Sequence, residues 1–503
     1  MPGSSTATAT TAPAATAVSA PGKVLLAGGY LVLDRAYTGL VFGLSARIGA
    51  VAQEIPTSPG VQLSEIVVHS PQFLDAEWRY GYHLAPEDGG IRVTQLRVGD
   101  KINPNHFVET TLAYVLTYIA GKTPQLPAHT FHPARLTVLA DNAYYSQPHS
   151  SSSTSQQSQT PSQPFTKGNP TRFAKFPTSL RDAHKTGLGS SAALVTALTA
   201  ALLTHYLGGK RTTTKPAAGG GGGQPFDLRT DGGKRVLHNL AQAAHCAAQG
   251  KVGSGFDVAA AVYGSIRYRR FSPAVLERLP EAGAPGFAPA LAACVDDEVS
   301  EDKTSPSPPS SWDTEALAAS NSEAGPRMPA GVALRMCDVD CGSQTVGMVK
   351  QVLAWRAREP AAARTLWDDL QAANEALGAA LRDESPDPEQ IKARVAAVRA
   401  LVRAMGEASG VPIEPPSQTA LLDALTAQVD GVYGGVVPGA GGFDALALLV
   451  RDDAATEARV RAFLERWSRE GEEGRGVVRL LDVKGEMEGV RMEELGQYAG
   501  WLY

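Results

Sequence analysis

The chain contains little cysteine, carries no excess of basic residues and lacks a phosphate-binding motif of the G-x-x-x-x-G-K-[ST] type. Four cysteines in 503 residues are too few for a disulfide framework and indicate a reducing compartment. The formal charge of −5 argues against a nucleic-acid-binding protein, which usually has a basic excess. Without the missing motif, any nucleotide site must be built in another way than in the P-loop proteins.

Long apolar runs are also absent, since none reaches the roughly 18–20 residues that a membrane helix needs. Residues 1–17 contain no arginine and no long apolar segment, so we expect a disordered tail and not a targeting peptide. These features together predict a soluble cytoplasmic enzyme.

Low-complexity segments divide the rest of the chain. One is rich in Ser, Gln, Thr and Pro, one contains five consecutive glycines, and one is rich in Ser, Pro and acidic residues. Such compositions bury too little apolar surface to offset chain entropy. We therefore predict a domain at 18–275 with inserts at 146–183 and 208–233, a linker or surface insert at 276–330, and a second domain at 331–503.

Apolar patterning predicts mainly strands in the first ninety residues and mixed helices and strands later, without regular alternation. This favours an α+β fold in two lobes. Val24–Leu33 is β-prone but interrupted by Gly28 and Gly29, so we expect one strand that turns into a second.

A glycine-rich stretch precedes an apolar segment at Lys185–Tyr206. Its loop consists of Gly187, Leu188, Gly189, Ser190, Ser191 and Ala192. Glycines let backbone N–H groups approach a ligand, and a helix N-terminus behind such a loop can bind phosphate. Ser190 or Ser191 could cap the helix. The alternative is an ordinary loop-to-helix turn in a core.

Two further stretches carry glycines, A-P-G-K-V-L-L-A-G-G-Y at Ala20–Tyr30 and V-V-P-G-A-G-G-F-D-A at Val436–Ala445. In this order, the three stretches resemble the three motifs of the GHMP kinase superfamily of small-molecule kinases. The resemblance implies a two-lobed GHMP kinase fold, with an N-terminal S5-domain-2-like lobe and a C-terminal ferredoxin-like lobe.

Within the superfamily the chain is most similar to phosphomevalonate kinases of fungal type. Mevalonate kinase-like members usually have G-E-H where this chain has Gly28, Gly29 and Tyr30, and Asn103–Leu112 and Gly255–Ser265 point the same way. The resemblance implies transfer of the ATP γ-phosphoryl group to 5-phosphomevalonate in isoprenoid and ergosterol biosynthesis. It implies ATP and Mg²⁺ as cofactors, a small-molecule partner, and a monomer or homodimer.

The resemblance identifies Lys23 and Asp257 as catalytic residues. Lys23 would hold the acceptor or the transferring phosphoryl group by its charge, although a lysine at a strand start is most often solvated. Asp257 would accept the proton of the attacking phosphate oxygen or only orient that oxygen, although aspartate is also common as a helix cap. A hydroxyl of Ser190 or Ser191 is a plausible Mg²⁺ ligand, because Mg²⁺ needs only one or two protein oxygens.

The acceptor carries a carboxylate and a phosphate, so its site needs cations and hydroxyl groups. The candidates are the arginine cluster Arg267–Arg270, which is more often a solvated strand face, and the residues Lys101, Ser343, Gln344, Thr345 and Gly441.

Three other functions stay open at this point: mevalonate kinase or another GHMP small-molecule kinase, diphosphomevalonate decarboxylase, and a non-catalytic ATP-binding regulator.

Overall fold

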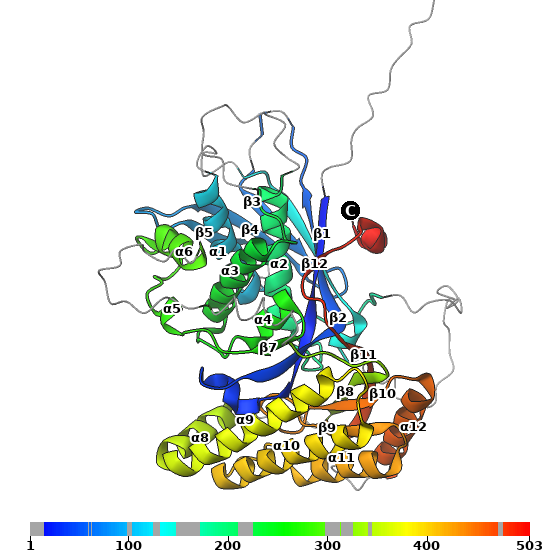
Figure 1. Ribbon diagram of the computed structural model, residues 1–503. Helices are drawn as coiled ribbons and strands as arrows, with labels where there is room; N and C mark the ends of the chain where they lie inside the picture. The colour runs from blue at the N-terminus through cyan, green and yellow to red at the C-terminus, as the bar shows by residue number, and fades with distance from the viewer. Residues whose placement is uncertain are drawn as a thin grey trace, which may run out of the picture.

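The computed structural model describes residues 15–58, 60–61, 63–97, 103–123, 131–146, 172–209, 225–296, 312, 325–340, 345–470 and 476–502. They form two lobes, one above the other in Figure 1. The strands are β1 (Ala15–Ala27), β2 (Gly39–Glu54), β3 (Glu65–His69), β4 (Glu77–Leu84), β5 (Ile91–Leu96), β6 (Ala134–Ala140), β7 (Ile266–Tyr268), β8 (Val332–Asp340), β9 (Val432–Val436), β10 (Ala445–Arg451), β11 (Val477–Glu486) and β12 (Arg491–Met492).

The α-helices are α1 (His106–Lys122), α2 (Ser190–Leu207), α3 (Asp231–Gln249), α4 (Phe256–Tyr263), α5 (Ala274–Glu277), α6 (Phe287–Asp296), α8 (Thr345–Arg358), α9 (Pro360–Arg382), α10 (Pro388–Ser409), α11 (Pro416–Gln428) and α12 (Ala454–Glu470). Three short 3-10 helices, η1 (Gly29–Leu33), η2 (Asn142–Tyr144) and η3 (Leu495–Trp501), complete the described elements.

One sheet runs through both lobes, in the strand order β5-β4-β3-β6-β2-β11-β8-β10-β9. β11 makes the connection, because its last residues pair with β2 and the rest of the strand pairs with β8. The C-terminal segment then returns to the first lobe, where β12 pairs with β1. The predicted mixture of helix and sheet in two lobes is confirmed.

The first lobe is organised around the long antiparallel pair of β1 and β2, whose register runs from Ala15 opposite Gln53 to Ala27 opposite Leu40. A β-bulge lies between Pro21 and Lys23. Helices α1, α2, α3 and α4 stack together on one face of the strands, with α2 packed against β1, β2 and the other three. The sequence analysis expected no apolar run long enough to cross a membrane, but α2 is long and apolar enough by length and composition alone. However, 67% of α2 is buried inside the protein. It has the surroundings of a core helix.

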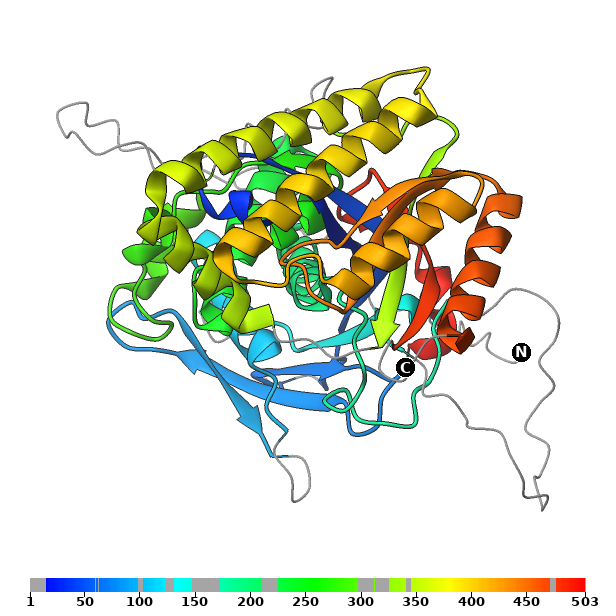
Figure 2. The same cartoon turned by 90° about the horizontal axis from the view of Figure 1, so that it is seen from below.

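The second lobe has helices on both faces of its strands, as the view from below shows (Figure 2). Along β10, Leu446 and Leu448 pack with side chains of α11 and α12, whereas Ala447 and Leu449 pack with those of α10. This alternation follows from the period of two along a strand. The lobes meet where α9 contacts β2.

The expected second strand within Val24–Leu33 is wrong, because Gly29–Leu33 forms the 3-10 helix η1. Gly28 has φ 115°, and a Cβ there would lie 2.6 Å from Gly39 Cα. The chain therefore turns sharply at the end of β1, where only glycine fits.

Segment boundaries differ from those expected. The C-terminal part of the expected second domain 331–503 returns to the first lobe at β12, and α3 begins within the expected insert 208–233. β1 begins at Ala15, within the segment expected as a tail. Phe173 and Phe176 are buried although they lie within the expected insert 146–183. Helix α6, within the expected linker 276–330, packs on α1 and α3 of the first lobe.

Candidate active site

The glycine loop of Gly187–Ala192 lies directly against β1. Lys23 N donates a hydrogen bond to Leu188 O at 3.0 Å. A Cβ at Gly22 would lie 2.9 Å from Leu188 O, and one at Gly189 would lie 2.8 Å from Lys23 Cε. The glycines of the first and second motifs therefore permit a contact that side chains would prevent.

Helix α2 begins at this loop, with Gly189 as its N-cap at φ 82° and with no side-chain cap. The expectation that Ser190 or Ser191 caps the helix is therefore wrong. Their hydroxyl groups remain available for other partners, and Ser190 has none among the residues that the structure describes. The N-terminal end of α2, with its free N–H groups and positive dipole end, lies next to the Lys23 side chain, which approaches the N-cap Gly189.

Lys23 projects from the bulged part of β1 toward helix α4. Its Nζ lies 5.4 Å from the centre of the Phe256 ring. Within the described ranges, no side chain or carbonyl hydrogen-bonds to Nζ or forms an ion pair with it. Burial lowers the pKa of Lys23, while the negative charge of Asp257 acts in the opposite direction. The site therefore holds a cation that lacks a direct partner.

Asp257 occupies the first turn of α4, after the N-cap Gly255 at φ 85°. Its Oδ1 accepts a hydrogen bond of 3.0 Å from Val258 N, so it satisfies one of the free N–H groups at the start of the helix. Its side chain is 23% exposed, which leaves the carboxylate accessible. Asp257 can therefore stabilise the start of α4 and still present its carboxylate to a ligand.

A residue that the sequence reasoning missed, His245 of α3, lies between the loop and Asp257. Its Nε2 is 3.1 Å from Ser191 Oγ and 3.9 Å from Asp257 Oδ2. The only signal in the sequence is a histidine on an amphipathic helix that also carries His238, and such a histidine more often marks a core position.

The third motif touches the first motif. Gly439 N donates to Leu25 O at 3.3 Å, and Tyr30 Oη donates to Ala440 O at 2.7 Å. Tyr30 belongs to the G-G-Y sequence that distinguishes this chain from mevalonate kinase-like members. Gly441 has φ 84°, and a Cβ there would lie 2.2 Å from Ile413 O. The loop thus brings the second lobe to the end of β1, and binding of substrate by Gly441 stays a prediction.

Three residues expected to bind substrate, Lys101, Ser343 and Gln344, lie outside the described residues. Thr345 is the first residue of α8. One turn later, Met348 Sδ lies 3.9 Å from the position of a Cβ on Gly442. The start of α8 therefore adjoins the third motif.

The arginine cluster does not form one site. Arg270 donates to Leu33 O at 2.8 Å and to Gly253 O at 2.9 Å, so it supports the loop before Asp257. Arg267 forms an ion pair of 2.7 Å with Glu375 on α9. Its neighbour Tyr268 instead donates to Ser254 O, on the side of α4. Successive strand residues point to opposite faces, so Arg267 points away from Asp257.

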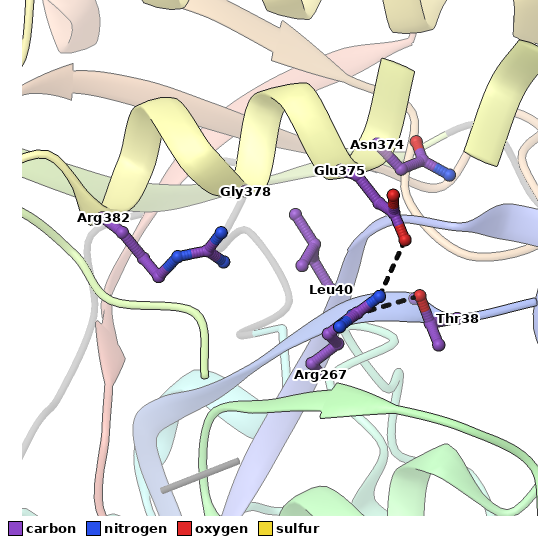
Figure 3. A pocket seen from close by; sticks show the side chains of 8 residues that line it. Thr38, Leu40, Arg267, Asn374, Glu375, Gly378 and Arg382 are labelled. Atoms are coloured by element: carbon purple, nitrogen blue, oxygen red, sulfur yellow. Dashed lines mark hydrogen bonds and ion pairs between the residues drawn. The ribbon is translucent and has the colours of Figure 1, made fainter. Parts of the chain in front are cut away.

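Arg267 lines a cavity of about 150 Å³ between the lobes (Figure 3). Thr38, Glu375 and Arg382 also line it, and none of the catalytic candidates does. The cavity is therefore separate from the site at Lys23.

No group of three or more His, Cys, Asp or Glu side chains in the described part of the chain could hold a metal ion. The hydroxyl groups of Ser190 and Ser191 and the carboxylate of Asp257 are a smaller set of oxygens. Such a set fits Mg²⁺, which keeps several waters and phosphate oxygens as ligands.

Comparison with known proteins gives the same answer as the motifs. No family model matches the chain. A phosphomevalonate kinase of Gibberella zeae is 58% identical over 97% of this chain and 98% of its own length. A phosphomevalonate kinase of Aspergillus fumigatus is 45% identical over 97% of this chain and 99% of its own.

A solved structure with the same fold is Streptococcus pneumoniae phosphomevalonate kinase in complex with phosphomevalonate and AMPPNP. It has a TM-score of 0.54 and 16% identity, and the match covers 93% of this chain and 99% of that one. The fold match and the near full-length relatives confirm the resemblance found in the three motifs, and this chain belongs to the phosphomevalonate kinase family.

Proposed function

We propose that this protein transfers the γ-phosphoryl group of ATP to 5-phosphomevalonate, giving 5-diphosphomevalonate and ADP. The observation that carries the proposal is the cation of Lys23, which has no direct partner and lies between the glycine loop and the first turn of α4. An anionic ligand would supply the missing partner. The identity of the acceptor is supported by the names of the relatives and by the ligands named for the S. pneumoniae complex.

The N-terminus of α2 binds the phosphates of ATP in this mechanism. Its first N–H groups have no partner within the helix, and the helix dipole favours negative charge there. Lys23 lies against Gly189 at the same point. Its ammonium group neutralises the charge that builds up on the transferring phosphoryl group.

Transfer is a direct displacement. An oxygen of the acceptor phosphate forms a bond to the γ-phosphorus, and the bond from that phosphorus to the β–γ bridging oxygen breaks, so ADP leaves with the negative charge. A phosphate monoester has a second pKa of about 6, so the nucleophile is already an anion at neutral pH. Asp257 therefore orients the reacting groups and has no need to remove a proton.

When Mg²⁺ is bound with the nucleotide, Ser190, Ser191 and Asp257 would hold it, and it would neutralise phosphate charge.

The test is release of ADP from ATP in parallel reactions with mevalonate, 5-phosphomevalonate, 5-diphosphomevalonate and galactose, with CO₂ monitored. We expect turnover with 5-phosphomevalonate alone and no CO₂. Turnover with mevalonate alone would show that the protein is a kinase with mevalonate as its acceptor. Release of CO₂ from 5-diphosphomevalonate would identify a decarboxylase, and binding of ATP without any turnover would favour a regulator.

A further inference from the structure

A buried histidine joins the glycine loop to the catalytic aspartate. We propose that His245 is a positioning residue for phosphoryl transfer, which holds Ser191 of the loop in a fixed orientation next to Asp257. The proposal rests on the proposed function, because it assigns a role within that reaction. It adds a residue that belongs to none of the three motifs.

The geometry brings three helices to one ring nitrogen. His245 Nε2, on α3, lies 3.1 Å from Ser191 Oγ at the start of α2 and 3.9 Å from Asp257 Oδ2 at the start of α4. The His245 side chain is 3% exposed, whereas Asp257 is 23% exposed. The imidazole thus lies behind the two groups, within hydrogen-bond distance of Ser191 and close to Asp257.

The ring itself is held from two sides. Gln249, one turn later on α3, places its Nε2 3.2 Å from His245 Nε2. The Phe107 ring of α1 lies 5.7 Å away, centre to centre, at an angle of 35°. Phe107 belongs to the N-P-N-H-F-V-E sequence at Asn103–Glu109. Packing and hydrogen bonding together leave the imidazole one orientation.

The contacts of His245 decide its tautomer. The side-chain amide nitrogen of Gln249 is a donor, so Nε2 accepts a hydrogen bond and the ring hydrogen lies on Nδ1. The Ser191 hydroxyl group also directs its hydrogen at Nε2, and the lone pairs of Ser191 Oγ face the site. The hydroxyl group stays in this orientation, so no rotamer must be selected during the reaction.

A second buried histidine of α3 serves as a matched control. His238 is 1% exposed and bonds through Nδ1 with Asn239 Oδ1 at 3.1 Å. Its ring packs on Tyr263 and Trp312, and it contacts none of the catalytic candidates. Replacement of His238 therefore reports the cost of losing a buried imidazole from the same helix.

The experiment compares His245→Leu, His245→Gln and His238→Leu with the wild-type enzyme. Leucine removes the polar contact, while the side-chain amide oxygen of glutamine can accept a hydrogen bond in the place of Nε2. We expect His245→Leu to lower kcat about 100-fold with KM for both substrates changed less than about threefold. His245→Gln restores kcat to within about tenfold of wild type, and His238→Leu lowers thermal stability without this loss of kcat.

Double variants separate positioning from a structural role. If His245 acts through Ser191, the effect of His245→Leu falls below about tenfold in a Ser191→Ala background. Equal effects in both backgrounds, or a glutamine variant as poor as the leucine variant, would overturn the proposal. Failure of the proposed function can be distinguished from failure of the His245 proposal, because wild-type turnover on 5-phosphomevalonate is measured first. If wild type prefers another acceptor, the variants are compared on that acceptor.

Discussion

Two cations project from the same pair of strands and have opposite surroundings. Arg47 of β2 is 1% exposed and donates to Ser19 Oγ at 2.7 Å, to Glu486 Oε2 at 3.2 Å and to the Gly489 carbonyl. Glu493 lies 3.9 Å away as a further counter-charge. Lys23 of β1 has no such partner in the described part of the chain. Arg47 therefore has a full set of hydrogen-bond partners within the protein, as a structural cation needs. Lys23 has none among the described residues, as we expect of a cation that binds a ligand.

Burial lowers the pKa of both groups, and a carboxylate opposes it in each case: Glu486 for Arg47 and Asp257 for Lys23. The difference lies in the hydrogen bonds. Those of Arg47 connect the first lobe to the C-terminal segment, since Glu486 and Gly489 come more than 400 residues later. The Lys23 ammonium group donates to no atom of the described residues, as our proposal of a phosphate-binding role requires.

Replacement of the incomplete cation should give the largest effect on activity. We expect Lys23→Met to lower kcat/KM about 1,000-fold, because a charge aimed at the transferring phosphoryl group is lost. The midpoint of thermal unfolding should not fall, since the lysine side chain has no hydrogen bond to lose. Steady-state assays and a melting curve on one preparation check both statements. A large fall in the midpoint would contradict the comparison.

Replacement of the saturated cation should affect stability instead. We expect Arg47→Met to reduce the free energy of unfolding by about 3–5 kcal/mol, because the ion pair with Glu486 is lost and the carbonyl groups of Ser19 and Gly489 stay buried without their donor. Urea denaturation measures this change. Activity per folded molecule should stay within about threefold of wild type, since a structural cation makes no transition-state contact. A loss below about 1 kcal/mol would show that the ion pairs contribute little.

A variant that displaces Lys23 but keeps its charge tests whether the position of the ammonium group matters for activity. We expect Gly189→Ala to lower kcat about 10- to 100-fold, because the new Cβ would lie 2.8 Å from Lys23 Cε. Gly187→Ala is the control, since its φ of 72° imposes a similar strain but its Cβ meets no atom within 4 Å. Steady-state rates of the two variants decide the point. Equal losses would assign the effect to backbone strain.

The smallest effect concerns pH. The pKa of Lys23 in the unfolded chain is about 10.5 and is lowered in the fold. Between the two values the unfolded state binds more protons, so the Lys23 contribution to stability becomes more favourable as pH rises. Urea unfolding of wild type and Lys23→Met between pH 7 and 10.5 should show this, with wild type gaining relative to the variant. No relative gain would mean that the Lys23 pKa is not lowered.

Patterns within short stretches of the sequence predicted much of the fold and of the candidate site. The glycines of the three motifs are recognisable because a positive φ or a close backbone contact admits no other residue, as at Gly189 and Gly441. Apolar patterning predicted that the first ninety residues are mainly strands and that helices and strands mix later, as the structure has them. Two local predictions were wrong. η1 replaced a strand because Gly28 turns the chain, and Gly189 replaced a serine as the cap of α2.

The sequence by itself determined the family and the fold class, because each of the three motifs is recognisable from residues close together in the chain. The catalytic roles of Lys23 and Asp257 stay predictions. The tertiary structure alone decided that His245 reaches Ser191, that Tyr30 joins the lobes through Ala440, and that β11 carries one sheet across both. These contacts join residues 54 and 410 positions apart in the first two cases. Neither spacing nor composition encodes such a contact, because it depends on how whole elements pack.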